Sequence, residues 1–371
     1  MIYIHIPFCV QKCRYCDFLS FPGVSGKIQK RYIDTLCREL VLRSGEAEGE
    51  EIPSVFFGGG TPSVLPEGCI RQLMDTVREN YRLTPNAEIT LEMNPGTITP
   101  EKAKEWKAAG INRISMGMQS MDDGLLEKLG RIHRSGEVPE SVGILVDAGF
   151  TNISFDLMFG LPGQNLETFR DTLDQVTKLP IRHLSVYSLI VEEGTEFDTL
   201  YQAGKLDLPP EEIERAMYHE AIRYLDALGM KQYEISNFAY PGYESRHNLG
   251  YWERKFYIGA GLGSSSLSLD QKRFKDTSDL SAYLDNPLLR EEEECLSRED
   301  QMSETMFLGL RKISGISLKE FTDTFGISPL EVYGEEIRRH IDQGLLVLQE
   351  GRLFLSPRGL DLANQVFVSF V

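Results

Sequence analysis

Six short β-rich runs, each followed by an amphipathic segment, occupy roughly the first 285 residues of this chain. The runs are residues 2–6, 54–57, 88–93, 113–118, 152–158 and 183–189. Strands and helices that alternate in this way form a parallel sheet, because each helix returns the chain to start the next strand in the same direction. Several runs are nearly continuously apolar, which predicts strands covered on both faces. The pattern predicts an α/β fold, either an open barrel or a large doubly wound sheet.

The sequence changes character near residue 290. Its acidic run at residues 290–295 predicts a solvated linker or the start of a helix. Helix-like segments follow near 300–312, 317–325 and 329–342, and residues 344–359 alternate like a two-stranded hairpin, which together give the outline of a winged helix. Since 371 residues exceed the usual size of one domain, we expect a large domain at 1–290 and a small one at 291–371.

Composition and charge limit the partners of the chain. The net charge is 39 − 56 = −17, and an acidic surface opposes nonspecific binding of nucleic acid or anionic membranes. A winged helix can bind DNA, but this charge favours a docking or lid role for the small domain. The sequence has no apolar run long enough to cross a bilayer, and its first residues read as a strand rather than a signal peptide. We therefore expect a cytoplasmic protein.

Three of the six cysteines, Cys9, Cys13 and Cys16, form a C-x3-C-x2-C loop directly after the first predicted strand. In a reducing compartment, clustered cysteines are more often metal ligands or catalytic groups than disulfides. A structural zinc loop is the alternative. Structural zinc usually takes four ligands in two pairs, however, and no second pair exists here. Three thiolates suit a [4Fe–4S] cluster whose fourth iron stays open for chemistry. The other cysteines are expected to be ordinary, partly buried side chains: Cys37, Cys69 and Cys295.

Glycines and polar residues stand at the ends of the next predicted strands. They are the run Gly58–Pro62, Glu92, Gln119 with Ser120 and Arg131 further on, and Asp156 lies within the fifth predicted strand. Because the carboxyl ends of parallel strands meet at one edge, we expect these residues to lie together beside the cysteine loop. Each has an ordinary alternative, since a glycine run can be a tight turn and a carboxylate can pair with an arginine. Acidic groups in apolar strands are costly without a partner, which favours a shared site.

The cysteine spacing resembles that of the radical S-adenosylmethionine (SAM) superfamily, in which the open iron chelates SAM and an electron from the cluster cleaves it to methionine and a 5′-deoxyadenosyl radical. Together YIHIPFC, GGGTP, EMNPG, SMGMQS, RIHR, DLMFGLPGQ and YEISNFA resemble the oxygen-independent coproporphyrinogen oxidase (HemN) group over the whole chain. The resemblance implies a partial (β/α)6 TIM-like barrel with a small winged-helix-like C-terminal domain. It also implies SAM contacts at Tyr3, Gly59, Gly60, Thr61, Glu92, Gln119, Arg131 and Asp156.

Two departures separate this chain from the oxidase of that group. The oxidase has a fourth cysteine, C-x3-C-x2-C-x-C, at the position that Phe18 occupies here. Only eight residues precede Cys9, so we expect the oxidase's N-terminal extension to be absent. The segment RHNLGYW instead resembles the H-N-x-x-Y-W mark of the heme chaperone branch, HemW. This resemblance implies a heme site at His247, with Asn248, Tyr251 and Trp252 beside it.

The chemistry of this motif leaves two interpretations open. An imidazole can ligate heme iron and aromatic rings can face a porphyrin. Alternatively, His247 and Asn248 hydrogen-bond a loop while Tyr251 and Trp252 pack the barrel mouth. The next segment, residues 257–266, has a similar ambiguity: its glycines and serines either approach a ligand or form a strand and turn under the barrel.

Together with the resemblance, the sequence predicts a heme chaperone with a [4Fe–4S] cluster and SAM. Its cargo would be heme, delivered to respiratory hemoproteins, and an electron donor would reduce the cluster. The alternative is an enzyme that oxidatively decarboxylates the propionates of coproporphyrinogen III. Productive SAM cleavage, transient membrane association and a homodimer are left open, and no nucleic-acid partner is expected.

Overall fold

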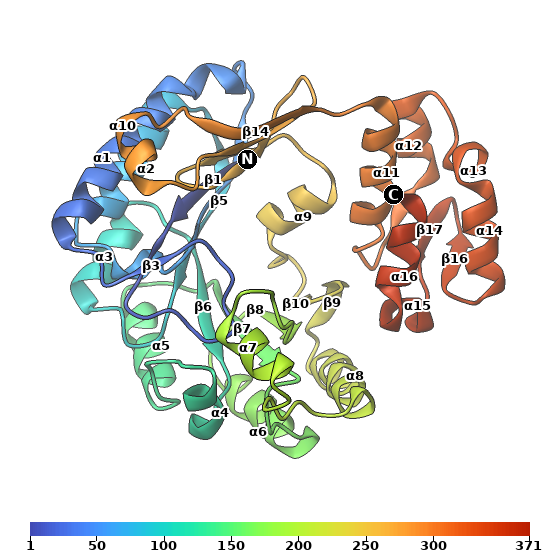
Figure 1. Ribbon diagram of the computed structural model, residues 1–371, viewed down its shortest axis with the longest axis horizontal. Coiled ribbons are helices and arrows are strands. Elements are labelled where there is room, and N and C mark those ends of the chain that lie inside the picture. The colour runs from blue at the N-terminus through green and yellow to red at the C-terminus, as the bar shows by residue number, and fades with distance from the viewer.

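In the computed structural model, which describes residues 1–371, the sheet curves into the wall of a partial barrel (Figure 1). Seven parallel strands lie in the order β11-β1-β4-β5-β6-β7-β8, and β10 and β9 extend the sheet with antiparallel pairing. All six predicted strands are present, so the α/β prediction is confirmed. The bounds are β1 Ile2–Ile6, β4 Ile52–Gly59, β5 Leu83–Met93, β6 Arg113–Gln119, β7 Ile153–Phe159, β8 His183–Ser188, β9 Lys231–Glu234, β10 Asn237–Ala239 and β11 Ile258–Ala260.

The barrel strands are apolar on the face toward the helices and largely polar on the inside. Along β6, the residues in the main hydrophobic core are Ile114, Met116 and Met118. The alternate residues line an internal cavity: Arg113, Ser115, Gly117 and Gln119. The inner face of β6 therefore surrounds a cavity instead of packing against a second apolar layer.

The helices between the strands pack around the outside of the sheet in Figure 1, and their apolar faces complete a core of 54 buried residues. Their bounds are α1 Gly26–Leu42, α2 Cys69–Asn80, α3 Pro100–Ala108, α4 Asp123–Lys128, α5 Glu137–Asp147, α6 Leu166–Val176, α7 Glu196–Gln202 and α8 Glu211–Ala227. This arrangement leaves the carboxyl ends of the parallel strands free to carry loops, as the sequence pattern predicted.

A small antiparallel sheet follows the barrel strands, in the order β12-β13-β14. The acidic run at 290–295, predicted as a linker or helix start, is in fact strand β14. It is extended because it pairs with the basic strand β13, where Arg273 lies opposite Glu294 and Lys275 lies opposite Glu292. The bounds in this region are α9 Arg246–Trp252, β12 Ser265–Leu267, β13 Lys272–Asp276, α10 Leu280–Asp285 and β14 Arg290–Cys295.

The C-terminal residues form a lobe beside the barrel with its own core of 15 buried residues (Figure 1). The predicted hairpin is present as β16 and β17, with β15 as a third strand, and the helix expected at 329–342 is divided at Tyr333. The bounds are α11 Arg298–Gly309, β15 Ile316–Ser317, α12 Leu318–Phe325, α13 Pro329–Val332, α14 Gly334–Asp342, β16 Leu346–Gln349, β17 Arg352–Leu355, α15 Pro357–Asp361 and α16 Ala363–Phe367. The boundary between residues 290 and 291 stays a prediction.

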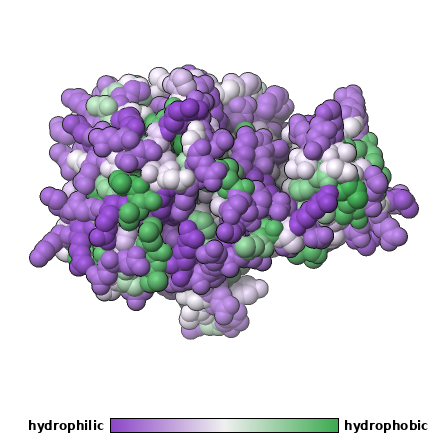
Figure 2. Space-filling view, turned by 90° about the horizontal axis from the view of Figure 1, so that it is seen from above, coloured by the Kyte–Doolittle hydropathy of each residue, from purple (hydrophilic) through white to green (hydrophobic).

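Seen from above, the surface is mostly hydrophilic, and its apolar side chains gather in separate groups (Figure 2). The C-terminal lobe projects to one side in this view. None of the helices combines the length and the apolar character that crossing a membrane requires.

Candidate functional site

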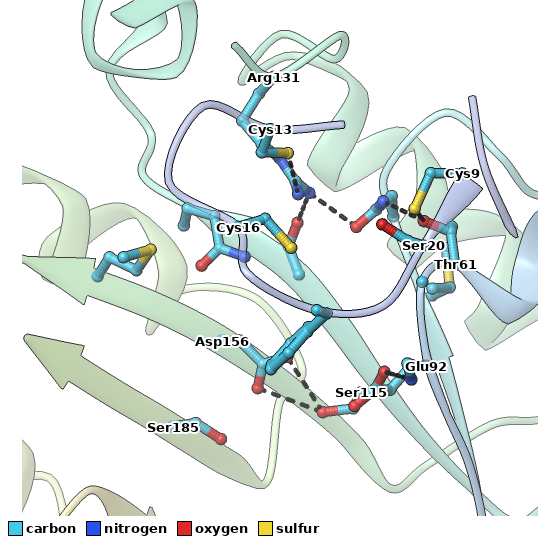
Figure 3. A pocket seen from close by; sticks show the side chains of 18 of the residues that line it. Cys9, Cys13, Cys16, Ser20, Thr61, Glu92, Ser115, Arg131, Asp156 and Ser185 are labelled. Carbon is cyan, nitrogen blue, oxygen red and sulfur yellow. Dashed lines mark hydrogen bonds between the residues drawn. The ribbon is translucent and has the colours of Figure 1, made fainter. Parts of the chain in front are cut away.

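The cysteine loop lies beyond the carboxyl end of β1 and is closed at its base by two short parallel strands. These are β2 Phe8–Cys9 and β3 Phe21–Pro22, paired Phe8 to Phe21 and Cys9 to Pro22. In Figure 3 the loop carries all three thiols above the strands of the barrel. Each of the three cysteines is partly buried, and together they line one cavity of about 390 Å³. That volume is in the usual range of small-molecule pockets.

Two side chains from elsewhere in the barrel direct donors at these sulfurs. Thr61 Oγ1 lies 3.5 Å from Cys9 Sγ, and Arg131 Nη1 lies 3.6 Å from Cys13 Sγ. Burial raises the pKa of Cys16 to about 11. No three His, Cys, Asp or Glu side chains are grouped to hold a single metal ion. The loop therefore offers three separated thiols, two of them next to hydrogen-bond donors that favour a thiolate.

The glycine run at the end of β4 is required because β1 and the cysteine loop approach it closely. Gly60 donates its N–H to Ile6 O at 2.9 Å, and a Cβ at Gly60 would stand 2.7 Å from Phe8 O. At Gly59 the backbone φ is +107°, and a Cβ would stand 2.5 Å from the His5 ring. Gly59 and Gly60 also line the cavity, so the run both fixes the loop and forms part of the wall.

Two carboxylates face the cavity from neighbouring parts of the sheet, as Figure 3 shows. Glu92 accepts a hydrogen bond from the Gly59 N–H at 3.2 Å, and Asp156 accepts one from Ser115 Oγ at 3.3 Å. Burial, reinforced by the negative charge of Asp156, raises the pKa of Glu92 to about 8. Burial also raises the pKa of Asp156. Both groups are poised to accept hydroxyl or ammonium donors from a ligand, because such partners offset the cost of their burial.

The next two predicted residues are Gln119, the last residue of β6, and Arg131, which follows α4. Gln119 lines the cavity and has a backbone φ of +65°, at a point where the pairing register between β6 and β7 shifts. This left-handed conformation is strained for glutamine and is a recurrent mark of ligand sites. Arg131 Nη2 donates to Asn94 Oδ1 at 2.7 Å and to Gly117 O, which fixes the guanidinium against the cysteine loop.

Tyr3 is the one predicted SAM residue that does not line the cavity. Its hydroxyl lies 3.0 Å from His5 Nδ1, and His5 Nε2 lies 3.0 Å from Leu19 O. Because a carbonyl can only accept, Nε2 carries the proton and Tyr3 donates to Nδ1. In this structure Tyr3 therefore supports the cysteine loop through His5. Its direct contact with SAM stays a prediction.

The predicted heme motif lies on α9, at the opposite end of the barrel strands. His247 packs beside Ser54, near the start of β4, whereas the cysteine loop follows the end of β1. His247 is 1% exposed, and its ring nitrogens lie 2.9 Å from Ser54 Oγ and 3.0 Å from Tyr251 Oη. Burial, with the charges of the N-terminus and Arg113, lowers its pKa to about 3. Both nitrogens are thus already occupied by neighbouring hydroxyls.

The remaining residues of the motif have three different surroundings. Asn248 lines the same cavity as the cysteines, and the Tyr251 ring packs edge-on against Tyr257. Trp252 lies under the guanidinium of Arg311, 4.4 Å from its ring centroid, so it contacts the C-terminal lobe. These residues lie at the floor of the barrel, the end where its parallel strands begin, rather than at its mouth, where the cysteine loop lies. Of the four motif residues, Asn248 alone shares the cavity of the predicted SAM residues.

Residues 257–266 contain β11, a turn and the start of β12. The segment is therefore a strand and turn, one of the two interpretations that its sequence allowed. Glu39 of α1 accepts from the Gly261 N–H in the turn, and Arg43, just after α1, donates to Ser266 Oγ in β12, both at 2.9 Å. None of these ten residues lines the cavity.

Several cavity residues were not predicted as site residues: Tyr15, Phe56, Asn94, Arg113, Ser115, Met158, Ser185 and Tyr187. Most occupy alternate positions on β4, β6, β7 and β8, so the period-two alternation of each strand was the available signal. Asn94 belongs to the EMNPG motif, whose position after β5 already pointed to the same edge.

Comparison with known proteins agrees with this geometry. Residues 3–176 match the radical SAM superfamily, and residues 296–362 match the HemN C-terminal domain. The fold is similar to that of coproporphyrinogen III oxidase (HemN) from Escherichia coli, a radical SAM enzyme, with a TM-score of 0.86 and 23% identity. This match covers 100% of the present chain and 89% of that one. At this identity the likeness shows the fold, and it confirms the partial barrel with a small C-terminal domain.

Several relatives are more similar to this chain in sequence than that oxidase is. The chain is 39% identical to heme chaperone HemW of Bacillus subtilis over 100% of this chain and 98% of that protein. It is 38% identical to heme chaperone HemW of Lactococcus lactis, over 100% and 96% of the two chains. A match to heme chaperone HemW of Escherichia coli, at 39% identity, covers 71% and 68%. The chain therefore belongs to the HemW family of the radical SAM superfamily.

Proposed function

We propose that this protein is a heme carrier that holds a [4Fe–4S] cluster on Cys9, Cys13 and Cys16 and binds SAM beside it. The observation that carries the proposal is the single cavity of about 390 Å³, which the three thiols share with seven of the eight predicted SAM residues. The relatives that match the chain over nearly their whole length are named heme chaperones, and this supports heme as the cargo.

The residues present fit the cluster and SAM. Three thiols with donors at two sulfurs suit a cluster that keeps one iron for another ligand. When bound, the reduced cluster would supply the electron for cleavage of the SAM sulfonium. Glu92 and Asp156 are placed to accept from hydroxyl or ammonium groups of SAM, and Arg131 can pair with its carboxylate. The strained backbone of Gln119 holds its amide toward the same cavity.

Heme capture by His247 requires a local rearrangement. Both imidazole nitrogens are engaged with hydroxyls, so the bond to Ser54 or the bond to Tyr251 must break before one nitrogen can ligate iron. The imidazole is otherwise suitable, since its lowered pKa keeps it neutral near pH 7. We propose that α9, a helix of seven residues, moves to expose His247 when heme arrives. Respiratory hemoproteins would be the acceptors, and a separate protein would donate the electron.

Decarboxylation of coproporphyrinogen III is the less favoured function. The likeness to HemN extends to the fold, at 23% identity. Phe18, at the position of that enzyme's fourth cysteine, is 61% exposed and lines the cavity with its apolar ring.

The proposal is tested by an anaerobic heme titration of cluster-reconstituted protein, followed by the Soret band. We expect saturable binding by the wild type and binding at least tenfold weaker for His247→Ala, because an axial ligand is lost. The Cys37→Ala variant, changed on α1 away from the cavity, should bind like the wild type. Absence of heme binding by the wild type would exclude the carrier function, whereas equal binding by His247→Ala would move the heme site away from α9.

A further inference from the structure

The inner face of the barrel has a floor that the predicted SAM residues do not reach. Arg113 is the first residue of β6 and Gln119 is the last, so their backbones are roughly 20 Å apart along the strand. Both side chains line the same cavity, one from the start of the strand and the other from its end. Arg113 therefore points into the cavity from the end opposite the cysteine loop.

Arg113 is the one charged side chain of the cavity wall that makes no hydrogen bond or ion pair. It is 2% exposed, and its Nε is a buried donor without a partner. The other cations are engaged, because Arg131 donates to Asn94 Oδ1 and Lys12 donates to Phe18 O. A buried guanidinium whose donors lack hydrogen-bond partners is costly, so its presence calls for an acceptor that the chain itself does not place in contact with it.

The carboxylates of the cavity do not meet this need. Asp156 accepts from Ser115, and Glu92 accepts from the Gly59 N–H, while neither forms an ion pair with Arg113. The positive charge of Arg113 acts without direct contact on both carboxylates, where it opposes the rise in their pKa, and on two neighbouring imidazoles. After burial, it is a cause of the lowered pKa of His183 and, with the N-terminus, of His247.

Neutral donors stand in the wall with Arg113. Ser185 and Tyr187 from β8 and Asn248 from α9 line the same cavity and add hydroxyl and amide groups. Figure 3 shows Ser185 on the strand beside Asp156, at a distance from the cysteine loop. A planar guanidinium can bind a carboxylate with two parallel hydrogen bonds, and neutral donors beside it can complete such a site.

We propose that Arg113 anchors a carboxylate of the bound ligand at the floor of the barrel. A tetrapyrrole propionate and the carboxylate of SAM are the two sources of this group. The propionate is favoured, since the predicted SAM residues gather at the opposite strand ends, and His247 and Asn248 belong to the floor. This choice of source rests on the proposed heme function, whereas the carboxylate site itself does not.

The test compares heme with heme dimethyl ester, which keeps the ring and iron but has no free carboxylate. The wild type should bind heme about tenfold to hundredfold more tightly than the ester, as expected for one charge-assisted hydrogen-bonded pair. Arg113→Gln should bind both alike, and Arg113→Lys should recover part of the preference. The control is Arg182→Gln, an exposed arginine stacked on Tyr240 and Tyr243, which should keep the wild-type preference. An unchanged preference in Arg113→Gln, or none in the wild type, overturns the propionate assignment.

Two further measurements test whether Arg113 has a structural role and which ligand supplies the carboxylate. Removal of an unpartnered buried cation should leave the Tm of the ligand-free protein unchanged or raise it, whereas a marked fall would show a structural ion pair and overturn the proposal. Equilibrium dialysis with SAM tests the other source. If Arg113→Gln binds SAM tenfold more weakly and keeps the preference for heme over its ester, the site binds the SAM carboxylate. If the wild type binds no heme, the heme function fails, and the SAM measurement alone decides the carboxylate site.

Discussion

Arg131 donates a hydrogen bond from Nη1 to the Sγ of Cys13 at 3.6 Å, across 118 residues of sequence. The same guanidinium is held by Asn94 and by Gly117 O, so its position is fixed from β5 and β6. A donor directed at a cluster-ligating sulfur stabilises the more negative, reduced state of the cluster. This contact joins the loop that would carry the cluster to the strands that would carry SAM.

Replacement of Arg131 by methionine should therefore shift the midpoint potential of the reconstituted cluster to a more negative value. The change removes the sulfur's donor and a positive charge while preserving much of the side-chain volume. Potentiometric titration followed by electron paramagnetic resonance measures the shift. Arg134→Met, which changes an exposed arginine paired with Glu127, should keep the wild-type potential. An unchanged potential in Arg131→Met would mean that Cys13 does not ligate the cluster.

The three loop cysteines should be individually required for the cluster. Cys9→Ala, Cys13→Ala or Cys16→Ala removes a thiolate that no other cysteine can replace, since Cys37, Cys69 and Cys295 do not line the cavity. We expect iron and sulfide to fall well below four per chain after anaerobic reconstitution. The Cys69→Ala and Cys295→Ala variants are the controls and should retain a full cluster. A full cluster in any of the three loop variants would contradict this ligand set.

Glu92 should make the ligand-free protein less stable as the pH rises. Its pKa is about 8 in the folded state against an ordinary value of 4.5, so between these values the folded chain holds a proton that the unfolded chain releases. The stability is complete below the lower value and declines up to the higher one. Glu92→Gln removes this decline, and its free energy of unfolding should exceed that of the wild type at about pH 8 by on the order of a few kcal/mol.

Urea unfolding at about pH 5.5 and about pH 8 measures this difference. The exposed Glu101→Gln variant on α3 is the control and should follow the wild type at both pH values. Equal destabilisation of the wild type and Glu92→Gln over this range would show that Glu92 is ionised in the folded protein.

His247 should contribute to stability as well as to heme binding. His247→Ala leaves the hydroxyls of Ser54 and Tyr251 without their partner, which should cost on the order of 2–4 kcal/mol. Tyr251→Phe removes one of these bonds and should cost about 1 kcal/mol. Denaturant unfolding measures both costs.

The two variants should differ in heme titrations. Tyr251→Phe frees Nε2 and should bind heme at least as tightly as the wild type, whereas His247→Ala should bind it more weakly. Weakening of heme binding in both variants in proportion to lost stability would assign His247 a purely structural role.

The strands, the cysteine loop and the strand-end residues could be predicted from local patterns, because each depends on a few neighbouring side chains. The strand at residues 290–295 could not, since its acidic residues are extended by pairing with Arg273 and Lys275 of β13. The floor position of His247 was likewise inaccessible, because it depends on how α9 closes the far end of the barrel against Ser54. Arg113 was missed for a different reason: its lack of a partner becomes visible only when every neighbour is placed.

The most direct test of the carrier function is heme transfer from the loaded protein to the apo form of a b-type respiratory hemoprotein. The account predicts that the Soret spectrum changes from that of the carrier complex to that of the acceptor, and that His247→Ala delivers less heme. Transfer at the rate of free heme in solution, or heme retained on the carrier with acceptor in excess, would contradict it.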